Sequence, residues 1–149
     1  MVNKEEFYEA LGKVLKGMKE EEALFICGDF NGHVGGEADG HEGVHGCHGF
    51  ERRNVEGELL LEFAEARDLV VANTWFTKKE KQLVTYESGE NKSVIDYILV
   101  RKRDMRMLTD ATVIQSEPCI LQHKLLFCSV RWRAKVRKVK KMFVSKCRL

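Results

Sequence analysis

Several features that mark other protein classes are missing from this sequence of 149 residues. No apolar run approaches the roughly 20 residues that a membrane-spanning helix needs. The charged, amphipathic start MVNKEEFYEALGKVL is unlike a signal peptide. The chain has a single proline and no internal repeat or low-complexity segment. With 44% hydrophobic residues, it is predicted to form one soluble globular domain with its own core.

The cysteines lack the patterns of a disulfide framework or a standard metal motif. They are odd in number and include no C-x-x-C pair, being Cys27, Cys47, Cys119, Cys128 and Cys147. Cys27 and Cys128 lie within apolar runs, where cysteine behaves as a small hydrophobic residue. We therefore expect a reducing compartment, nuclear or cytoplasmic, and no contact with a membrane.

Acidic residues are absent from residues 131–149, although the whole chain has a net charge of only +2. The basic side chains there are Arg131, Arg133, Lys135, Arg137, Lys138, Lys140, Lys141, Lys146 and Arg148. Residues 1–130 consequently hold 16 basic and 23 acidic residues, a net charge of −7. We predict a domain over residues 1–131 and a basic tail over 132–149. The tail fits nucleic-acid binding or nuclear import, and it equally fits a solvated terminus.

Hydrophobic periodicity predicts two helices on either side of a glycine-rich loop. Residues 4–19 carry an apolar stripe through Phe7, Leu11, Val14, Leu15 and Met18. Asn54 is a suitable N-cap for a second helix, with its stripe at Val55, Leu59, Phe63 and Ala66. Residues 28–57 hold nine of the twelve glycines and predict a long irregular loop.

Short apolar runs predict the strands. They cover Leu24–Gly28, Leu69–Ala72, Leu83–Tyr86, Val94–Val100, Thr112–Ile114 and Leu125–Val130. The stretch ESGENK predicts a turn, and Pro118 predicts a loop. Strand, helix and strand alternate early and strands dominate later, which indicates an α/β or α+β layered sheet.

Asp96 is the one charged residue in the apolar run VIDYILV. Such a run is typical of a strand in a sheet that is covered on both faces. Burying a lone carboxylate there is unfavourable unless a cation or hydrogen-bond donors compensate. The residue therefore indicates a functional site, unless it lies at the wet end of the strand and only caps a turn.

Two further polar groups lie near strand ends. Asp29 and Asn31 directly follow the run LFIC, where α/β sheets place ligand-binding loops, although both residue types also start turns. His123 precedes the strand at Leu125, where a side chain can reach a shared cleft, although a lone loop histidine usually has no function.

Together these groups match the chemistry of phosphodiester cleavage. The reaction needs a deprotonated water, positive charge or donors on the phosphoryl oxygens, and aligned groups. A carboxylate beside a histidine can hold the imidazole in one tautomer, as in hydrolytic triads. A carboxylate and an amide two residues apart can orient the water and the phosphate.

Five blocks carry a resemblance to a known family. They are GDFN (28–31), RNVEGELLLEFAEARDLVVANTWF (53–76), TYES (85–88), SVIDYILV (93–100) and QHKLL (122–126). In this order they resemble the C-terminal half of the endonuclease/exonuclease/phosphatase (DNase I-like) family, over roughly residues 20–131. The likeness is greatest to the endonuclease domains of LINE-type retrotransposons and to the craniofacial development protein 2-like group derived from them.

The resemblance implies one half of a two-sheet β-sandwich flanked by helices and Mg²⁺-dependent DNA nicking, with Mn²⁺ as a substitute metal. It implies that Asp29 handles the attacking water or the leaving group, with a weak claim as a metal ligand. It assigns phosphate contacts to Asn31 and His123, and the carboxylate partner of His123 to Asp96. Asn73 and Thr74 match a loop near the nucleic acid and are predicted substrate-binding residues.

This chain departs from the family pattern in three places. The family usually reads Ser-Asp-His where this chain has Leu121-Gln122-His123, and Gln122 is a poorer ligand for a hard cation. Val94 stands where related sequences often carry a polar residue. The family's first half, which supplies an Asn and the main metal-binding Glu, has no counterpart here. We therefore expect a truncated domain with weak or no activity and an incompletely covered core.

Two other interpretations also fit the sequence. The chain can be a non-catalytic module that binds DNA, chromatin proteins or other nuclear proteins through the basic tail. Alternatively, His33, His41, His45, Cys47 and His48 can form a zinc site, although their spacing matches no standard zinc module.

Overall fold

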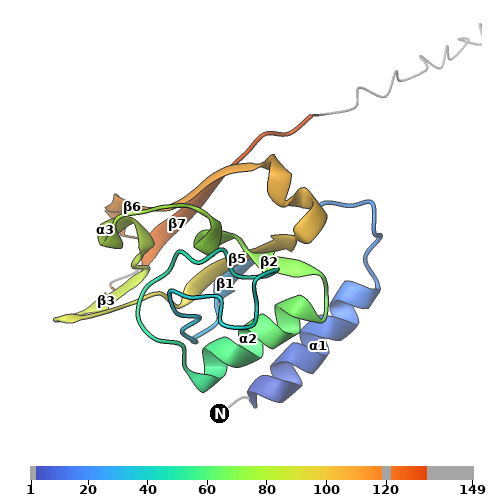
Figure 1. The fold of residues 1–149 in the computed structure, drawn as a ribbon, viewed down its shortest axis with the longest axis horizontal. Coiled ribbons are helices and arrows are strands. Elements are labelled where there is room, and N and C mark those ends of the chain that lie inside the picture. The colour runs from blue at the N-terminus through green and yellow to red at the C-terminus, as the bar shows by residue number, and fades with distance from the viewer. Residues whose placement is uncertain (1–2, 119–121, 134–149) are drawn as a thin grey trace, which may run out of the picture.

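The computed structural model describes residues 3–118 and 122–133, and it has three layers (Figure 1). The helices are α1 (Lys4–Lys16), α2 (Val55–Glu65) and α3 (Glu80–Leu83), with 3-10 turns η1 (Ala72–Trp75) and η2 (Lys102–Met107). The strands are β1 (Phe25–Asp29), β2 (Leu69–Val71), β3 (Tyr86–Ser88), β4 (Asn91–Ser93), β5 (Asp96–Arg101), β6 (Leu108–Pro118) and β7 (Lys124–Val130). Among the described residues, no helix is long and apolar enough to cross a membrane.

The central layer is a three-stranded antiparallel sheet in the order β1-β5-β2. Helices α1 and α2 cover one face, and the β6–β7 hairpin lies on the other (Figure 1). A second, small hairpin pairs β3 with β4. The predicted α+β class is confirmed, with antiparallel pairing throughout these sheets.

Strand β5 is central because its alternate side chains enter two different cores. Tyr97 and Leu99 pack with residues of α1 and α2, whereas Ile98 and Val100 pack towards the β6–β7 hairpin. All four are at most 4% exposed. This two-sided burial explains why VIDYILV lacks the alternation of a half-exposed strand, and it confirms the sequence prediction.

The helices lie where they were predicted, but the side of α1 that is buried differs in part from the prediction. Asn54 caps α2 as expected, accepting a hydrogen bond from the Gly57 N–H. In α1, Leu11 and Leu15 of the predicted stripe pack against the core, whereas Phe7, Val14 and Met18 are exposed. The buried residues of this helix are Tyr8 and Gly12. A Cβ atom at Gly12 would collide with the Arg67 guanidinium, so this buried position has no room for a larger side chain.

Two strand predictions differ from the structure: Leu83–Tyr86 is mostly not a strand, and Thr112–Ile114 is only part of a longer one. Leu83 ends helix α3, and the strand begins only at Tyr86, in a hairpin whose tip falls within ESGENK. Thr112–Ile114 is the middle of the 11-residue strand β6, which pairs with β7 and so extends beyond its apolar segment. Pro118, predicted to lie in a loop, instead ends strand β6 and pairs with Lys124. Residues 119–121 and most of the predicted tail lie outside the described residues.

The loop over residues 30–54 is irregular, as predicted, but it is closely tied to the core. His45 is 1% exposed, with Nε2 2.9 Å from the Gly35 carbonyl oxygen and Nδ1 accepting from the Cys47 N–H at 3.0 Å. The Arg53 guanidinium donates to four loop carbonyls and to the Glu58 carboxylate. These bonds replace a regular ladder as the source of order in the loop.

A pH dependence of stability follows from His45, because burial lowers its pKa in the folded state. The unfolded chain protonates this residue near its ordinary pKa of about 6.5. The contribution of His45 to the free energy of unfolding is therefore complete above that pH, and it is lost as the pH drops towards the lower pKa of the folded state. Urea unfolding should show that the free energy of unfolding falls between pH 7.5 and 5, and that the fall is smaller in His45→Gln. Equal pH dependence in both chains would contradict this role of His45.

At Gly57 in α2, we predict that alanine destabilises the fold, although helix propensity alone favours alanine. Alanine is a better helix former than glycine by about 1 kcal/mol. A Cβ atom at this position, however, would collide with the backbone carbonyl of His33. We expect Gly57→Ala to lower the free energy of unfolding by about 1–3 kcal/mol, as for other overpacked sites. Gly17→Ala meets no such collision and is the matched control; equal effects would disprove the steric cause.

Candidate active site

Asp29 and Asp96 face each other as the terminal pair of the β1–β5 ladder. Asp29 ends β1 and Asp96 begins β5, so antiparallel pairing brings both residues to one edge of the sheet. Asp29 lies at the carboxyl end of its strand, as predicted, whereas Asp96 lies at the amino end of β5 because the two strands are antiparallel. Directly opposed carboxylates repel, so the pair needs a compensating partner.

The His123 imidazole supplies that partner by lying between the two carboxylates. Its Nδ1 is 3.0 Å from Asp96 Oδ2, and its Nε2 is 3.9 Å from Asp29 Oδ2. Candidate ligand atoms of these three residues all lie within 4.8 Å of one another, and the residues described contain no other such group of His, Cys, Asp or Glu. The structure thus brings together three of the four predicted catalytic side chains around one point.

The fourth residue, Asn31, joins the same corner through the backbone. Its N–H donates to Asp29 Oδ1 at 2.7 Å, and its φ of 44° is a left-handed conformation that asparagine adopts more readily than most residues. The Lys4 ammonium reaches from α1 to the carbonyl oxygens of Phe30 and Asn31, at 3.2 and 2.6 Å. These bonds fix the turn and leave Asp29 Oδ2 directed towards His123.

The position of Asp96 is held by two side chains that bond to the backbone of β5. Thr85 Oγ1 accepts from the N–H groups of Ile95 and Asp96 at 3.0 and 3.1 Å. The Asn73 amide donates to the Asp96 carbonyl and accepts from the Ile98 N–H, each at 3.0 Å. Asn73 therefore continues the ladder where β2 has ended.

The predicted substrate contacts, Asn73 and Thr74, are both buried, at 6% and 1% exposed. Thr74 Oγ1 donates to the Val71 carbonyl and accepts from the Gly46 N–H. Direct contact with a substrate would require these bonds to break, so the geometry assigns both residues a positioning role. Their contact with a substrate stays a prediction.

His123 is positioned from the β3 side of the structure. It forms an isolated bridge with Tyr86, whose ring meets the imidazole edge-on at a centroid distance of 5.0 Å. The neighbouring Gln122 accepts from the Tyr86 hydroxyl and donates to Ser88 Oγ, each at 3.0 Å. The neutral Gln122 thus ties the histidine segment to β3, a role compatible with its predicted inability to serve as a good metal ligand.

Sequence reasoning missed the supporting roles of Lys4, Thr85 and Tyr86. The block TYES belonged to the family resemblance, but no residue pattern linked it to His123. From sequence alone, a lysine in an amphipathic helix, such as Lys4, is expected to be a solvent-exposed charge. Only the packing of α1 beside the end of β1 reveals its contact.

A groove of about 650 Å³ extends from the three residues along β1, β5 and β7. Its walls include Ile98, Leu126 and Phe127, together with Cys27 and Cys128. Burial raises the pKa of both thiols, which favours the protonated and less nucleophilic form.

The residues of the suggested zinc site have separate partners. His41 lies between Glu58 and Glu65, His33 pairs with Glu51, and His48 is 3.5 Å from Thr77 Oγ1. With His45 bonded to the backbone, the structure does not bring these residues together as a metal cluster.

Comparison with known proteins identifies relatives of one kind. The chain is 33% identical over 132 residues to craniofacial development protein 2 of Tragulus javanicus and to that of Bos taurus. The match covers 87% of this chain but only 23% and 22% of those proteins, so the chain spans less than a quarter of their length. No family model matches. The predicted likeness to craniofacial development protein 2-like proteins is thus confirmed.

Asn73 offers a test of how the site is positioned. Asn73→Ala leaves the buried N–H of Ile98 without its acceptor, which should cost about 1–3 kcal/mol in the free energy of unfolding. It should also shift the NMR resonances of Asp96 and His123. Asn91→Ala, an exposed asparagine in β4, is the control and should change neither. Unaltered His123 resonances in Asn73→Ala would show that the amide does not position the site.

Proposed function

We propose that this chain carries a phosphodiesterase site of the endonuclease/exonuclease/phosphatase type, acting on DNA with the help of a divalent cation. The observation that carries the proposal is the His123 imidazole, held between two carboxylates that face each other where β1 ends and β5 begins. The proposal rests on this geometry and on the resemblance of the five sequence blocks.

Each residue has a role that its contacts support. Asp96 fixes the imidazole through Nδ1, which leaves Nε2 facing Asp29 and the groove. There His123 can transfer a proton or contact a phosphoryl oxygen. Asp29 is 43% exposed in its side chain and can orient an attacking water, and the exposed Asn31 can contact the phosphate.

The donor set fits a hard cation, although weakly. Asp29 Oδ2 is a hard, exposed oxygen, whereas Asp96 Oδ2 is engaged by His123 and Asp29 Oδ1 by the Asn31 N–H. Mg²⁺ is usually held by one or two carboxylates, with waters and substrate phosphates as further ligands. When bound, Mg²⁺ or Mn²⁺ would neutralise charge that develops on the phosphoryl group. With one carboxylate to hold it among the residues described, we expect low metal affinity and slow turnover.

The second candidate is a non-catalytic module that binds nucleic acid, chromatin proteins or other nuclear proteins. The basic run that begins with the exposed Arg131 and Arg133 favours it. Residues 134–149, which hold most of this charge, lie outside the described residues. The two candidates give opposite results when the site is mutated, since only the first requires His123.

Plasmid nicking in Mg²⁺ tests the proposed activity. We expect slow nicking that EDTA abolishes and that His123→Ala lowers by about 10²–10⁴-fold, the usual contribution of a general acid or base. Asp29→Ala should also reduce the rate. His48→Ala, which removes a histidine outside the site, is the matched control. Nicking that is absent in the unmodified chain, or unaffected in His123→Ala, would refute the assignment.

A further inference from the structure

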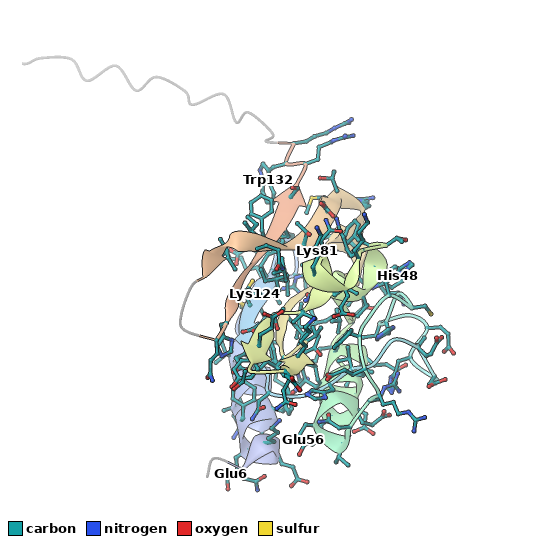
Figure 2. All side chains as sticks on the ribbon, turned by 90° about the vertical axis from the view of Figure 1, so that its left-hand side faces the viewer. Glu6, His48, Glu56, Lys81, Lys124 and Trp132 are labelled. Atoms are coloured by element: carbon teal, nitrogen blue, oxygen red, sulfur yellow. The ribbon has the colours of Figure 1, made fainter. Side chains whose placement is uncertain are left out.

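Three arginines and a tryptophan gather at the end of β7 that is remote from His123. Arg106, Arg131, Trp132 and Arg133, together with Met107, line a pocket of about 460 Å³. Figure 2 shows Lys124 and Trp132 near opposite ends of β7. We call these three arginines and Trp132 the β7-end cluster.

The fold assembles this cluster from two segments that are distant in sequence. Leu108 pairs with Val130 at the end of the β6–β7 ladder, and the Arg131 N–H donates to the Met107 carbonyl at 2.7 Å. This contact places Arg106, at the end of η2, beside the residues that follow β7. A cluster built from two segments is a property of the fold and does not require residues 134–149.

The guanidinium groups of the β7-end cluster are available to a ligand. Arg106, Arg131 and Arg133 are exposed, and none forms an ion pair within the described part of the chain. The nearby Arg101 and Arg103 differ, because both donate to the Glu22 carbonyl oxygen. Three unpaired guanidiniums around one pocket favour an anionic ligand such as phosphate.

Two exposed aromatic rings, one in β7 and one just after it, add a second recognition element. Trp132 is 60% exposed and Phe127 is 47% exposed, which is unusual for rings of this size. Phe127 lies within β7, five positions before Trp132, so the two rings are at most about 17 Å apart along an extended chain. Exposed rings interleaved with cations are the pattern by which proteins bind single strands, since bases stack on the rings and phosphates contact the cations.

We propose that the β7-end cluster binds unpaired, single-stranded nucleic acid, with a base stacked on Trp132 and phosphates on the three arginines. A duplex would not satisfy this site, because its base faces are already stacked inside the helix. The inference deepens the proposed function by naming the form of nucleic acid that the chain holds. The binding itself requires neither a metal nor cleavage.

The distance along β7 relates the cluster to the candidate active site. Trp132 lies nine positions after His123, a separation of at most about 30 Å for an extended strand. A single strand of several nucleotides can span both places, which agrees with the site sizes of roughly 4–16 nucleotides known for such grooves. The cluster would then hold unpaired nucleic acid a few nucleotides away from the phosphate at His123.

The two tryptophans of the chain provide the experiment. Trp75→Phe leaves Trp132 as the sole tryptophan reporter, whereas Trp132→Phe leaves Trp75, whose indole N–H bonds to the Val44 carbonyl. Both chains are titrated in EDTA with oligo(dT) and with a duplex of equal length, each of about 12 nucleotides per strand. We expect oligo(dT) to quench the fluorescence of Trp132 and to leave that of Trp75 unchanged. Unchanged Trp132 fluorescence at saturating oligo(dT), or tighter binding of the duplex, would overturn the inference.

Affinity measurements in the full chain separate the cluster from the remaining basic residues. Trp132→Ala should weaken oligo(dT) binding by about 5- to 150-fold, the range for loss of one stacked base. Replacing Arg106, Arg131 and Arg133 with alanine should reduce the slope of log K against log salt by about 2. Replacing the exposed Lys16, Lys19 and Arg52 is the control matched for charge. If both triple variants lose oligo(dT) affinity equally, the β7-end cluster is not the binding site. If the unmodified chain binds oligo(dT) as expected but does not nick plasmid, only the proposed catalysis is contradicted.

Discussion

The contact on which the site depends is the imidazole of His123 between two carboxylates that the β1–β5 ladder forces to face each other. Strand pairing alone would leave Asp29 and Asp96 in mutual repulsion at the end of the sheet. Placing His123 between them requires β7 to begin beside this edge, which the bonds from Thr85 and Tyr86 ensure. The order of the small β3–β4 region is therefore coupled to the geometry of the site.

The core separates into two parts with different functions. The side of the sheet that faces α1 and α2 contains most of the fully buried residues and gives the domain its stability. The side that faces the β6–β7 hairpin has a smaller core and retains a groove beside the carboxylates. A site at the more open side can admit a ligand without disturbing the larger core, in keeping with the lower local stability typical of binding regions.

Much of this arrangement was accessible from the sequence, for identifiable reasons. The run around Asp96 and the cap at Asn54 are local signals, because strand burial and helix capping depend on a few neighbouring residues. The meeting of Asp29, Asp96 and His123 was predicted from a family resemblance and required pairing across 67 residues, from 29 to 96, that no local pattern specifies. The burial of Gly12 in α1 could not be predicted, because the Arg67 guanidinium that lies against it comes from a segment distant in sequence. The same limit applies to Lys4 and to the β7-end cluster, both of which arise from packing between distant segments.

Strand β1 has a further consequence because it is the outer strand of its sheet and its stretch Cys27–Asp29 is exposed. The outer edge of a strand presents unpaired backbone groups to which another chain can add, and a charged side chain is a common protection against such pairing. Asp29 is the only charge on β1. The carboxylate proposed for catalysis is therefore also placed where it would oppose the pairing of a second chain, so replacing Asp29 would alter the strand edge as well as the site.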